Sequence, residues 1–143
     1  MKRSSIFYIL LIFIINTSAT YSLEEYPLNQ GIVFHDVSFS EALKKAKKEN
    51  KTIFLDAYTS WCGPCKKLKN FVFTDINVGA YFNSHFINLA VDMEKGEGLE
   101  LARKFNVQAY PTLFFINPKG DIIKTVIGYQ TADQLIQQAK SIQ

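Results

Sequence analysis

Short apolar runs alternate with longer amphipathic segments over most of the chain. Three of these runs have the length and the β-branched and aromatic content of buried strands: Thr52–Ala57, Phe86–Val91 and Thr112–Ile116. A turn signal at Asn117–Gly120 follows the third run, so Asp121–Ile127 predicts a strand that returns antiparallel to it. We also expect a short strand at Ile32–Phe34.

The segments between these strands predict helices with one apolar face. The first opens with a capping box at Ser38 and Glu41 and runs to about Asn50. We expect the other helices from Cys62 to Phe73, from Ile76 to Ser84, from Leu99 to Phe105, and from Thr131 to Ile142. Strands separated by helices pair in parallel, and the hairpin adds an antiparallel edge. The predicted fold is therefore α/β, a single domain over residues 31–143 with helices on both faces of a central mixed β-sheet.

The amino end of the chain has the layout of a secretory signal peptide. Lys2 and Arg3 precede an unbroken apolar run, Ile6–Ile15, and the small residues Thr17 and Ala19 fit a cleavage site after Ala19. The run is about half of the roughly 20 apolar residues that cross a bilayer, so we favour a cleaved signal over an uncleaved anchor. We therefore expect residues 1–19 to be removed, residues 20–30 to form a polar lead-in segment, and the protein to work in the periplasm or as a secreted protein.

Composition narrows the classes of function. The chain has 143 residues, 16 of them Lys or Arg and 13 of them Asp or Glu, for a formal net charge of +3. Without Lys2 and Arg3 the basic count falls to 14 and the charge to +1, which argues against nucleic acid as a partner. Two cysteines in the whole chain exclude a disulfide-dense scaffold.

Those two cysteines form a Cys-Gly-Pro-Cys motif at a predicted strand-to-helix junction. Cys62 would begin the helix, where unpaired N–H groups and the helix dipole favour a thiolate, the nucleophilic form of the side chain. Cys65 lies one turn further on, and we expect it to be the more buried of the two. Gly63 permits the close turn, and Pro64 suits a first helical turn because it needs no donor there.

Other uses of the two cysteines fit less well. A structural disulfide across two residues closes almost no loop and so gains little entropy. A closed zinc site needs four ligands, and His35 and His85 are not in a ligand-spaced motif. Haem attachment requires a histidine where Lys66 stands. We therefore favour a redox function for the two cysteines, and we expect it to need no metal or organic cofactor.

Two segments carry a family resemblance. Phe54–Lys66, with Trp61-Cys62-Gly63-Pro64-Cys65 at its centre, resembles the active-site segment of thioredoxins, and Tyr110–Phe115 resembles their second signature, a cis-proline before a strand. The chain is identified as a member of the thioredoxin superfamily, which implies a three-layer α/β/α sandwich. Phe71–Asp75 is more similar to the carboxy-terminal periplasmic domain of the transmembrane thiol:disulfide interchange reductase, of which this chain would be a free-standing relative.

The resemblance also implies roles for individual residues. Cys62 would be the attacking cysteine, and Cys65 the resolving one. Asp56 would be the buried acid that takes a proton from Cys65, and burial in an apolar strand should raise the pKa of its carboxyl. Pro111 would be cis. For substrate binding, the resemblance implies a docking surface made by these residues: Trp61, Gly63, Pro64, Tyr110 and Pro111.

The sequence departs from the family in three places. Asn88 stands where cytoplasmic thioredoxins carry a lysine near the buried acid, which weakens the expected proton relay. Tyr110 replaces the usual aliphatic residue before the cis-proline, so substrate choice should differ. The loop Asp92–Gly98 is longer and more acidic; we read it as an exposed, solvated loop in preference to a cation site.

The function these features favour is thiol-disulfide exchange with protein disulfides outside the cytoplasm. The Gly-Pro pair resembles the reducing members of the family, so we expect a monomeric net reductant. A reductant in an oxidising compartment needs electrons, which implies an upstream membrane thiol reductase as donor. Two alternatives stay open: an oxidase or isomerase that uses the same chemistry, and a redox-inactive binding or adaptor module.

Overall fold

The computed structural model describes residues 30–142, so the expectations for the signal peptide and for most of the lead-in segment lie outside the described residues. The elements in chain order are α1 (Phe39–Glu49), β1 (Thr52–Tyr58), α2 (Gly63–Lys67), a π-helical turn η1 (Leu68–Val72), α3 (Ile76–His85), β2 (Phe86–Asp92), α4 (Gly98–Lys104), β3 (Thr112–Ile116), β4 (Ile122–Ile127) and α5 (Ala132–Lys140). None of the helices in this part of the chain is long and apolar enough to cross a membrane.

The four strands form one mixed sheet in the order β2-β1-β3-β4. β1 pairs in parallel with β2 and antiparallel with β3, and β3 pairs antiparallel with β4. β1 is an interior strand because its residues are apolar on both faces, with Ile53, Phe54 and Leu55 all fully buried. The predicted α/β fold with a central mixed sheet is confirmed.

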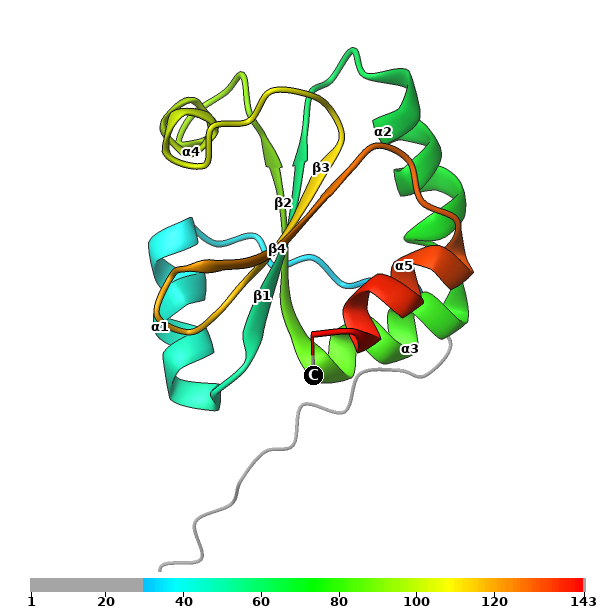
Figure 1. The fold of residues 1–143 in the computed structure, drawn as a ribbon, viewed down its shortest axis with the longest axis horizontal. Coiled ribbons are helices and arrows are strands. Elements are labelled where there is room, and N and C mark those ends of the chain that lie inside the picture. The colour runs from blue at the N-terminus through cyan, green and yellow to red at the C-terminus, as the bar shows by residue number, and fades with distance from the viewer. Residues whose placement is uncertain (1–29, 143) are drawn as a thin grey trace, which may run out of the picture.

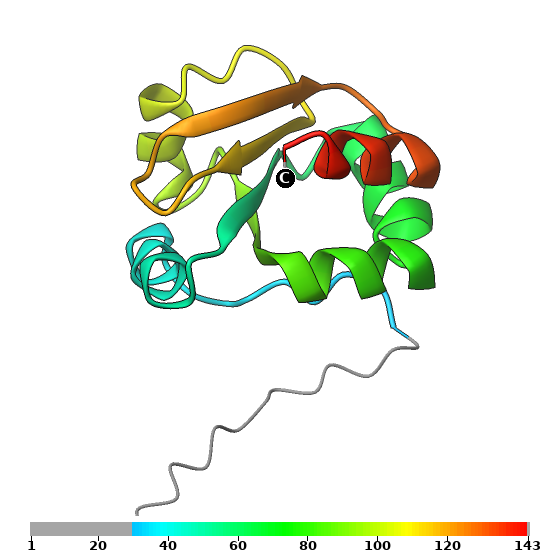
Figure 2. The ribbon, with the colours of Figure 1, turned by 60° about the horizontal axis from the view of Figure 1, so that its bottom comes forward.

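Helices cover both faces of the sheet (Figures 1 and 2). On one face α1 and α4 pack against the sheet around Leu55 and Leu89, and on the other α2, η1, α3 and α5 pack around Phe54 and Phe115. The second face is rich in aromatic contacts: the Phe54 ring lies 4.7 Å from that of Phe82, edge to face. Successive side chains of β1 point to opposite faces of the sheet, so this strand contributes to two separate cores and joins the layers.

Caps begin the helices where the sequence predicts them. Ser38 and Glu41 form a complete capping box on α1, as Thr131 and Gln134 do on α5. The Asp75 carboxylate accepts hydrogen bonds from the first turn of α3. Each of these caps satisfies N–H groups that the helix itself leaves unpaired, so the boundaries are fixed locally.

Two expectations about local structure are wrong. Ile32–Phe34 is extended but is no strand, because its neighbouring backbone bonds run to different partners: Ile32 N–H donates to the carbonyl of Phe73, and His35 N–H to that of Asn88. The helix expected from Cys62 to Phe73 is interrupted, since α2 ends at Lys67 and the π-helical turn η1 follows. Such turns occur often beside functional sites.

Candidate active site

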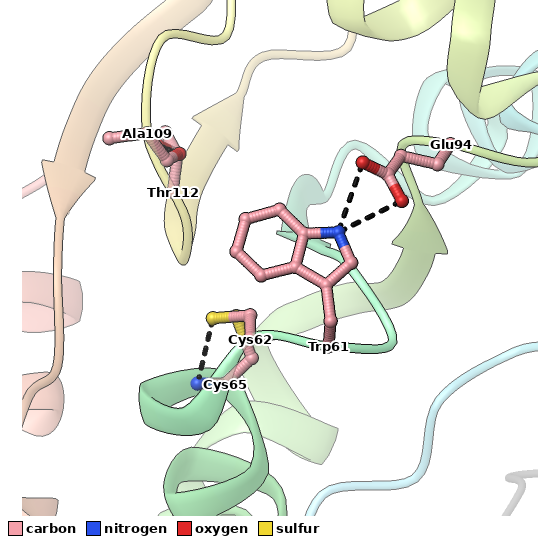
Figure 3. The surroundings of a disulfide bond; sticks show 6 residues. All are labelled: Trp61, Cys62, Cys65, Glu94, Ala109 and Thr112. Carbon is pink, nitrogen blue, oxygen red and sulfur yellow. Dashed lines mark hydrogen bonds between the residues drawn. A yellow bond between two sulfur atoms is a disulfide. The ribbon is translucent and has the colours of Figure 1, made fainter.

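The two cysteines lie where β1 gives way to α2. Cys62 is the N-cap residue of α2, and its Sγ accepts a hydrogen bond from the backbone N–H of Cys65 at 3.2 Å. A disulfide joins the two side chains (Figure 3), whose Cα atoms are 5.3 Å apart. The predicted position of Cys62 at a helix N-terminus is confirmed, and there the free N–H groups and the helix dipole stabilise a sulfur anion.

The expected difference in burial between the cysteines is wrong. Their exposed fractions are 3% for Cys62 and 5% for Cys65. Because the bridge holds the two sulfurs against each other, each shields the other from solvent. Gly63 and Pro64 are exposed beside the bridge, and a Cβ added at Gly63 would meet nothing within 4 Å. No neighbouring part of residues 30–142 therefore comes close enough to require a glycine at position 63, and the space in front of Gly63 is open.

Asp56 lies on β1, on the aromatic-rich side of the sheet, and is 4% exposed. Its Oδ1 is buried without a hydrogen-bond partner among the described residues. Desolvation raises the pKa of the Asp56 carboxyl from 3.8 to about 7, since burial disfavours the charged form. The rise expected from the sequence is confirmed, and desolvation by itself accounts for it. A carboxyl that titrates near neutral pH is suited to giving and taking a proton.

Asn88 does not take the place of the family's lysine. Its side-chain amide donates to the carbonyl of Val33 at 3.3 Å and to Oδ1 of Asn83 at 3.2 Å. Asn83 in turn donates to the carbonyl of Gly31 at 3.1 Å. These bonds hold the extended segment before α1, so Asn88 serves the fold rather than the proton chemistry of Asp56.

An aromatic pair lies next to the disulfide. Trp61 is 63% exposed, and its ring meets that of Tyr110 edge to face at a centroid distance of 6.0 Å. This places Trp61 on the surface and not in the core. The Tyr110–Pro111 peptide is cis, as the resemblance implied, and the Pro111 carbonyl accepts a hydrogen bond from the N–H of Gly128 at 2.8 Å.

Sequence reasoning missed Glu94. Both of its carboxylate oxygens lie 3.0 Å from Nε1 of Trp61, which donates to them (Figure 3). The loop that carries Glu94 was expected to be simply exposed, but Met93 is buried and its N–H donates to the carbonyl of Tyr58 at 2.8 Å. No spacing in the sequence could have shown this, because the contact joins two loops at the carboxyl ends of β1 and β2.

Thr59 is a second residue that the sequence did not single out. It is buried, and its hydroxyl has no hydrogen-bond partner among the described residues.

The structure shows no candidate metal site within residues 30–142. This part of the chain contains no group of three or more His, Cys, Asp or Glu side chains that could hold a metal ion. His85 stacks on Tyr81, at 4.2 Å between ring centroids, on the exposed end of α3.

A Cys-x-x-Cys pair that caps a helix, a cis-proline before a strand and a sheet of this order are together typical of the thioredoxin fold. The family model of the thioredoxin-like domain matches residues 39–143, and the chain belongs to this family. A solution structure from Bacteroides thetaiotaomicron, of a protein whose name as a disulphide-isomerase is provisional, is 50% identical, with a TM-score of 0.70, and the match covers 79% of this chain and 93% of that one. A thioredoxin from Thermus thermophilus shares the fold, with 22% identity and a TM-score of 0.69 over 78% of this chain and 87% of that one.

The chain is also similar to one part of a much longer protein. The thiol:disulfide interchange protein DsbD of Haemophilus influenzae is 31% identical over 123 residues, which are 82% of this chain and 21% of DsbD. This chain therefore spans about a fifth of the length of that relative. The carboxy-terminal domain of Neisseria meningitidis DsbD, in its oxidised form, has the same fold: the identity is 21%, the TM-score 0.63, and the coverage 78% of this chain and 99% of that domain.

Proposed function

We propose that this protein is a thiol-disulfide oxidoreductase that reduces disulfides in other polypeptides outside the cytoplasm. The observation that carries the proposal is the Cys62–Cys65 disulfide at the N-terminus of α2, with open space at Gly63 in front of it. Membership of the thioredoxin-like family and the similarity to DsbD support the same chemistry.

The reaction is a transfer of two electrons and two protons. The Cys62 thiolate attacks one sulfur of the substrate disulfide and releases the other as a thiolate, which takes up a proton. Asp56 accepts the proton of the Cys65 thiol, which suits a carboxyl with a pKa of about 7. The Cys65 thiolate then attacks Sγ of Cys62 and releases the second substrate sulfur as a thiolate, which takes up the proton that Asp56 gives back. The substrate is reduced, and the protein returns to the bridged form.

The same surface gives the substrate a place to bind. Trp61, Gly63 and Pro64 flank the bridge and are exposed, Tyr110 contacts the Trp61 ring, and Pro111 follows Tyr110 as a buried cis-proline. An extended substrate segment would pair with the backbone of Tyr110 and bring its disulfide to Cys62. In this proposal the electrons come from a membrane thiol reductase, a role suggested by the similarity to DsbD, and the protein works as a monomer in the periplasm or after secretion.

Reduction of a disulfide-bonded substrate such as insulin tests the chemistry. We expect the reduced protein to cleave the substrate, and we expect Cys62→Ser to abolish cleavage, a loss of at least about a thousandfold, because no other nucleophile stands in its place. Cys65→Ser should instead trap a mixed disulfide with the substrate. If wild type and Cys62→Ser are equally inactive while both still bind client proteins, the fold is a binding module instead.

The direction of electron flow needs its own measurement. The Gly-Pro pair between the cysteines favours a reductant, with a midpoint potential of about −270 mV, which equilibration with glutathione measures. A potential above roughly −150 mV would make the protein an oxidase or isomerase. The similarity to the provisionally named disulphide-isomerase makes the isomerase the second candidate, and recovery of activity by a scrambled substrate would identify it.

The export of the protein is part of the same proposal. We expect cleavage after Ala19, so that residues 31–143 form the working domain behind a lead-in of residues 20–30. Amino-terminal sequencing of exported protein is expected to begin at Thr20. A sequence that begins at Met1 would indicate an uncleaved anchor.

A further inference from the structure

The loop between β2 and α4 is anchored at both ends although its middle is exposed. Buried Met93 fixes the first end, with its N–H bonded to the carbonyl of Tyr58. At the other end, the Glu97 carboxylate accepts the first N–H of α1, from Phe39, at 3.0 and 3.2 Å. Gly98 packs so closely that a Cβ there would clash with the carbonyl oxygen of Asp92. The loop therefore holds its middle residues in a fixed place.

Glu94 is the acid that this loop presents to the disulfide site. Its two oxygens share one donor, Nε1 of Trp61, so most of their capacity to accept hydrogen bonds is left over. The neighbouring acids are engaged elsewhere: Asp92 pairs with Lys95 at 3.1 Å, and Glu97 binds the N-terminus of α1. Glu94 is exposed, and it has no ion pair within residues 30–142.

The position of Trp61 puts this charge within reach of a substrate. Trp61 directly precedes Cys62, and Figure 3 shows its indole with the nitrogen edge toward Glu94 and the disulfide on its other side. A polypeptide whose sulfur reaches Cys62 therefore has the exposed indole beside it. Its side chains next to the disulfide are then brought toward the carboxylate that Trp61 binds.

Two features of this corner favour the same kind of side chain. A carboxylate attracts a cation, and the exposed face of an indole attracts a cation through its π electrons. We propose that Glu94, with Trp61, is a specificity-determining site that takes a lysine or arginine side chain beside the disulfide of an incoming polypeptide. The proposal rests on the disulfide-exchange function proposed above and adds the substrate class that the site prefers.

Three peptides with one disulfide each test the proposal. They differ at one position next to a cysteine, which is Lys, Gln or Glu, and each reacts with the reduced full-length protein in a single turnover. We expect the Lys peptide to react roughly threefold faster than the Gln peptide, and the Glu peptide more slowly than both, as for a solvent-exposed ion pair. Added salt should reduce these ratios, since it screens exposed charges.

Glu94→Gln removes the charge and keeps an oxygen that can accept from Trp61, so the three peptides should then react at similar rates. Trp61 is the single tryptophan of the chain, so its fluorescence spectrum reports whether the indole keeps its place. Glu94→Asp keeps the charge and should keep part of the preference. Glu100→Gln is the matched control, because Glu100 is an exposed acid on α4 and the hydrogen bonds of the Trp61 indole run to Glu94, so the preference should persist in this variant.

The outcomes separate this inference from the function on which it rests. If the wild type reduces all three peptides equally, or if Glu94→Gln keeps the preference, the role of Glu94 is wrong and disulfide reduction stands. Equal loss of preference in Glu100→Gln would assign it to the general charge of this side of the molecule and would also overturn the proposal. If no peptide is reduced at all, it is the proposed function that fails.

Discussion

Two buried polar side chains on the same side of the sheet differ in their hydrogen bonding. Asn83 is fully engaged: its Oδ1 accepts from the N–H of Val33 at 2.8 Å and from Asn88 at 3.2 Å, and its Nδ2 donates to the carbonyl of Gly31. Asp56 is as deeply buried, yet its Oδ1 has no partner in the described chain. The first residue ties a loop to α3, and the second is left with a strongly raised pKa.

The contrast separates a structural polar group from one available for chemistry. A buried amide with all its hydrogen bonds stabilises the fold, because breaking those bonds would leave several buried donors and acceptors without partners. A buried carboxyl without hydrogen-bond partners lowers the free energy of unfolding whenever it is charged, and other interactions in the fold must outweigh this loss. Asp56 differs from Asn83 in that its carboxyl has a raised pKa and an unpaired oxygen, and three substitutions test this difference.

The largest effect is expected for Asp56→Asn. The folded pKa of about 7 lies above the ordinary 3.8, so the folded state binds the proton more tightly than the unfolded one. Stability therefore falls as the pH rises from about 4 to 7, and above that range the full penalty, about 4 kcal/mol, is present. Asp56→Asn removes the penalty. Urea unfolding of the oxidised protein should show the variant more stable by about this amount at pH 8 and similar to wild type at pH 4.

Asp36→Asn is the control for this substitution, because Asp36 is exposed before α1. Its effect should stay within about 0.5 kcal/mol at both pH values. A gain for Asp56→Asn that is equal at pH 4 and pH 8 would mean that burial of charge is not its cause.

Asn83→Ala is expected to have a smaller effect of the opposite sign. The substitution leaves the N–H of Val33 and the carbonyl of Gly31 without the Asn83 side chain as partner, and it removes one of the two acceptors of the Asn88 amide. It should destabilise the fold by about 3 kcal/mol at all pH values. The same Asn→Ala change at exposed Asn77, also on α3, is the matched control and should be nearly neutral. Denaturant unfolding measures both, and a neutral Asn83→Ala would contradict the structural role.

The smallest effect is expected for Thr59→Val, which replaces a buried hydroxyl without a partner by a methyl group of the same size. Removing an unpaired polar atom should stabilise the protein by about 1 kcal/mol. The change is measured by the same unfolding experiment. A clear loss of stability would show that the hydroxyl is hydrogen-bonded in solution, and Thr59 would then belong with Asn83 rather than with Asp56.

Much of the fold could be predicted because its signals are local. Apolar runs gave β1, β2 and β3, and capping residues such as Ser38, Asp75 and Thr131 gave helix starts. The errors concern features that depend on distant partners. Whether Ile32–Phe34 is a strand depends on hydrogen bonds to residues after β1, and the equal burial of the two cysteines depends on the bridge between them.

The sequence by itself determined the chemistry, since a Cys-x-x-Cys pair after a buried strand and before a helix brings two sulfurs together through local geometry alone. The tertiary structure decided the environment of that chemistry. It buried Asp56 and left its Oδ1 without a hydrogen-bond partner in residues 30–142, while the amide of Asn88 donates to Val33 and Asn83. It also placed Glu94 against Trp61, because two loops that are distant in the chain meet where parallel β1 and β2 end together.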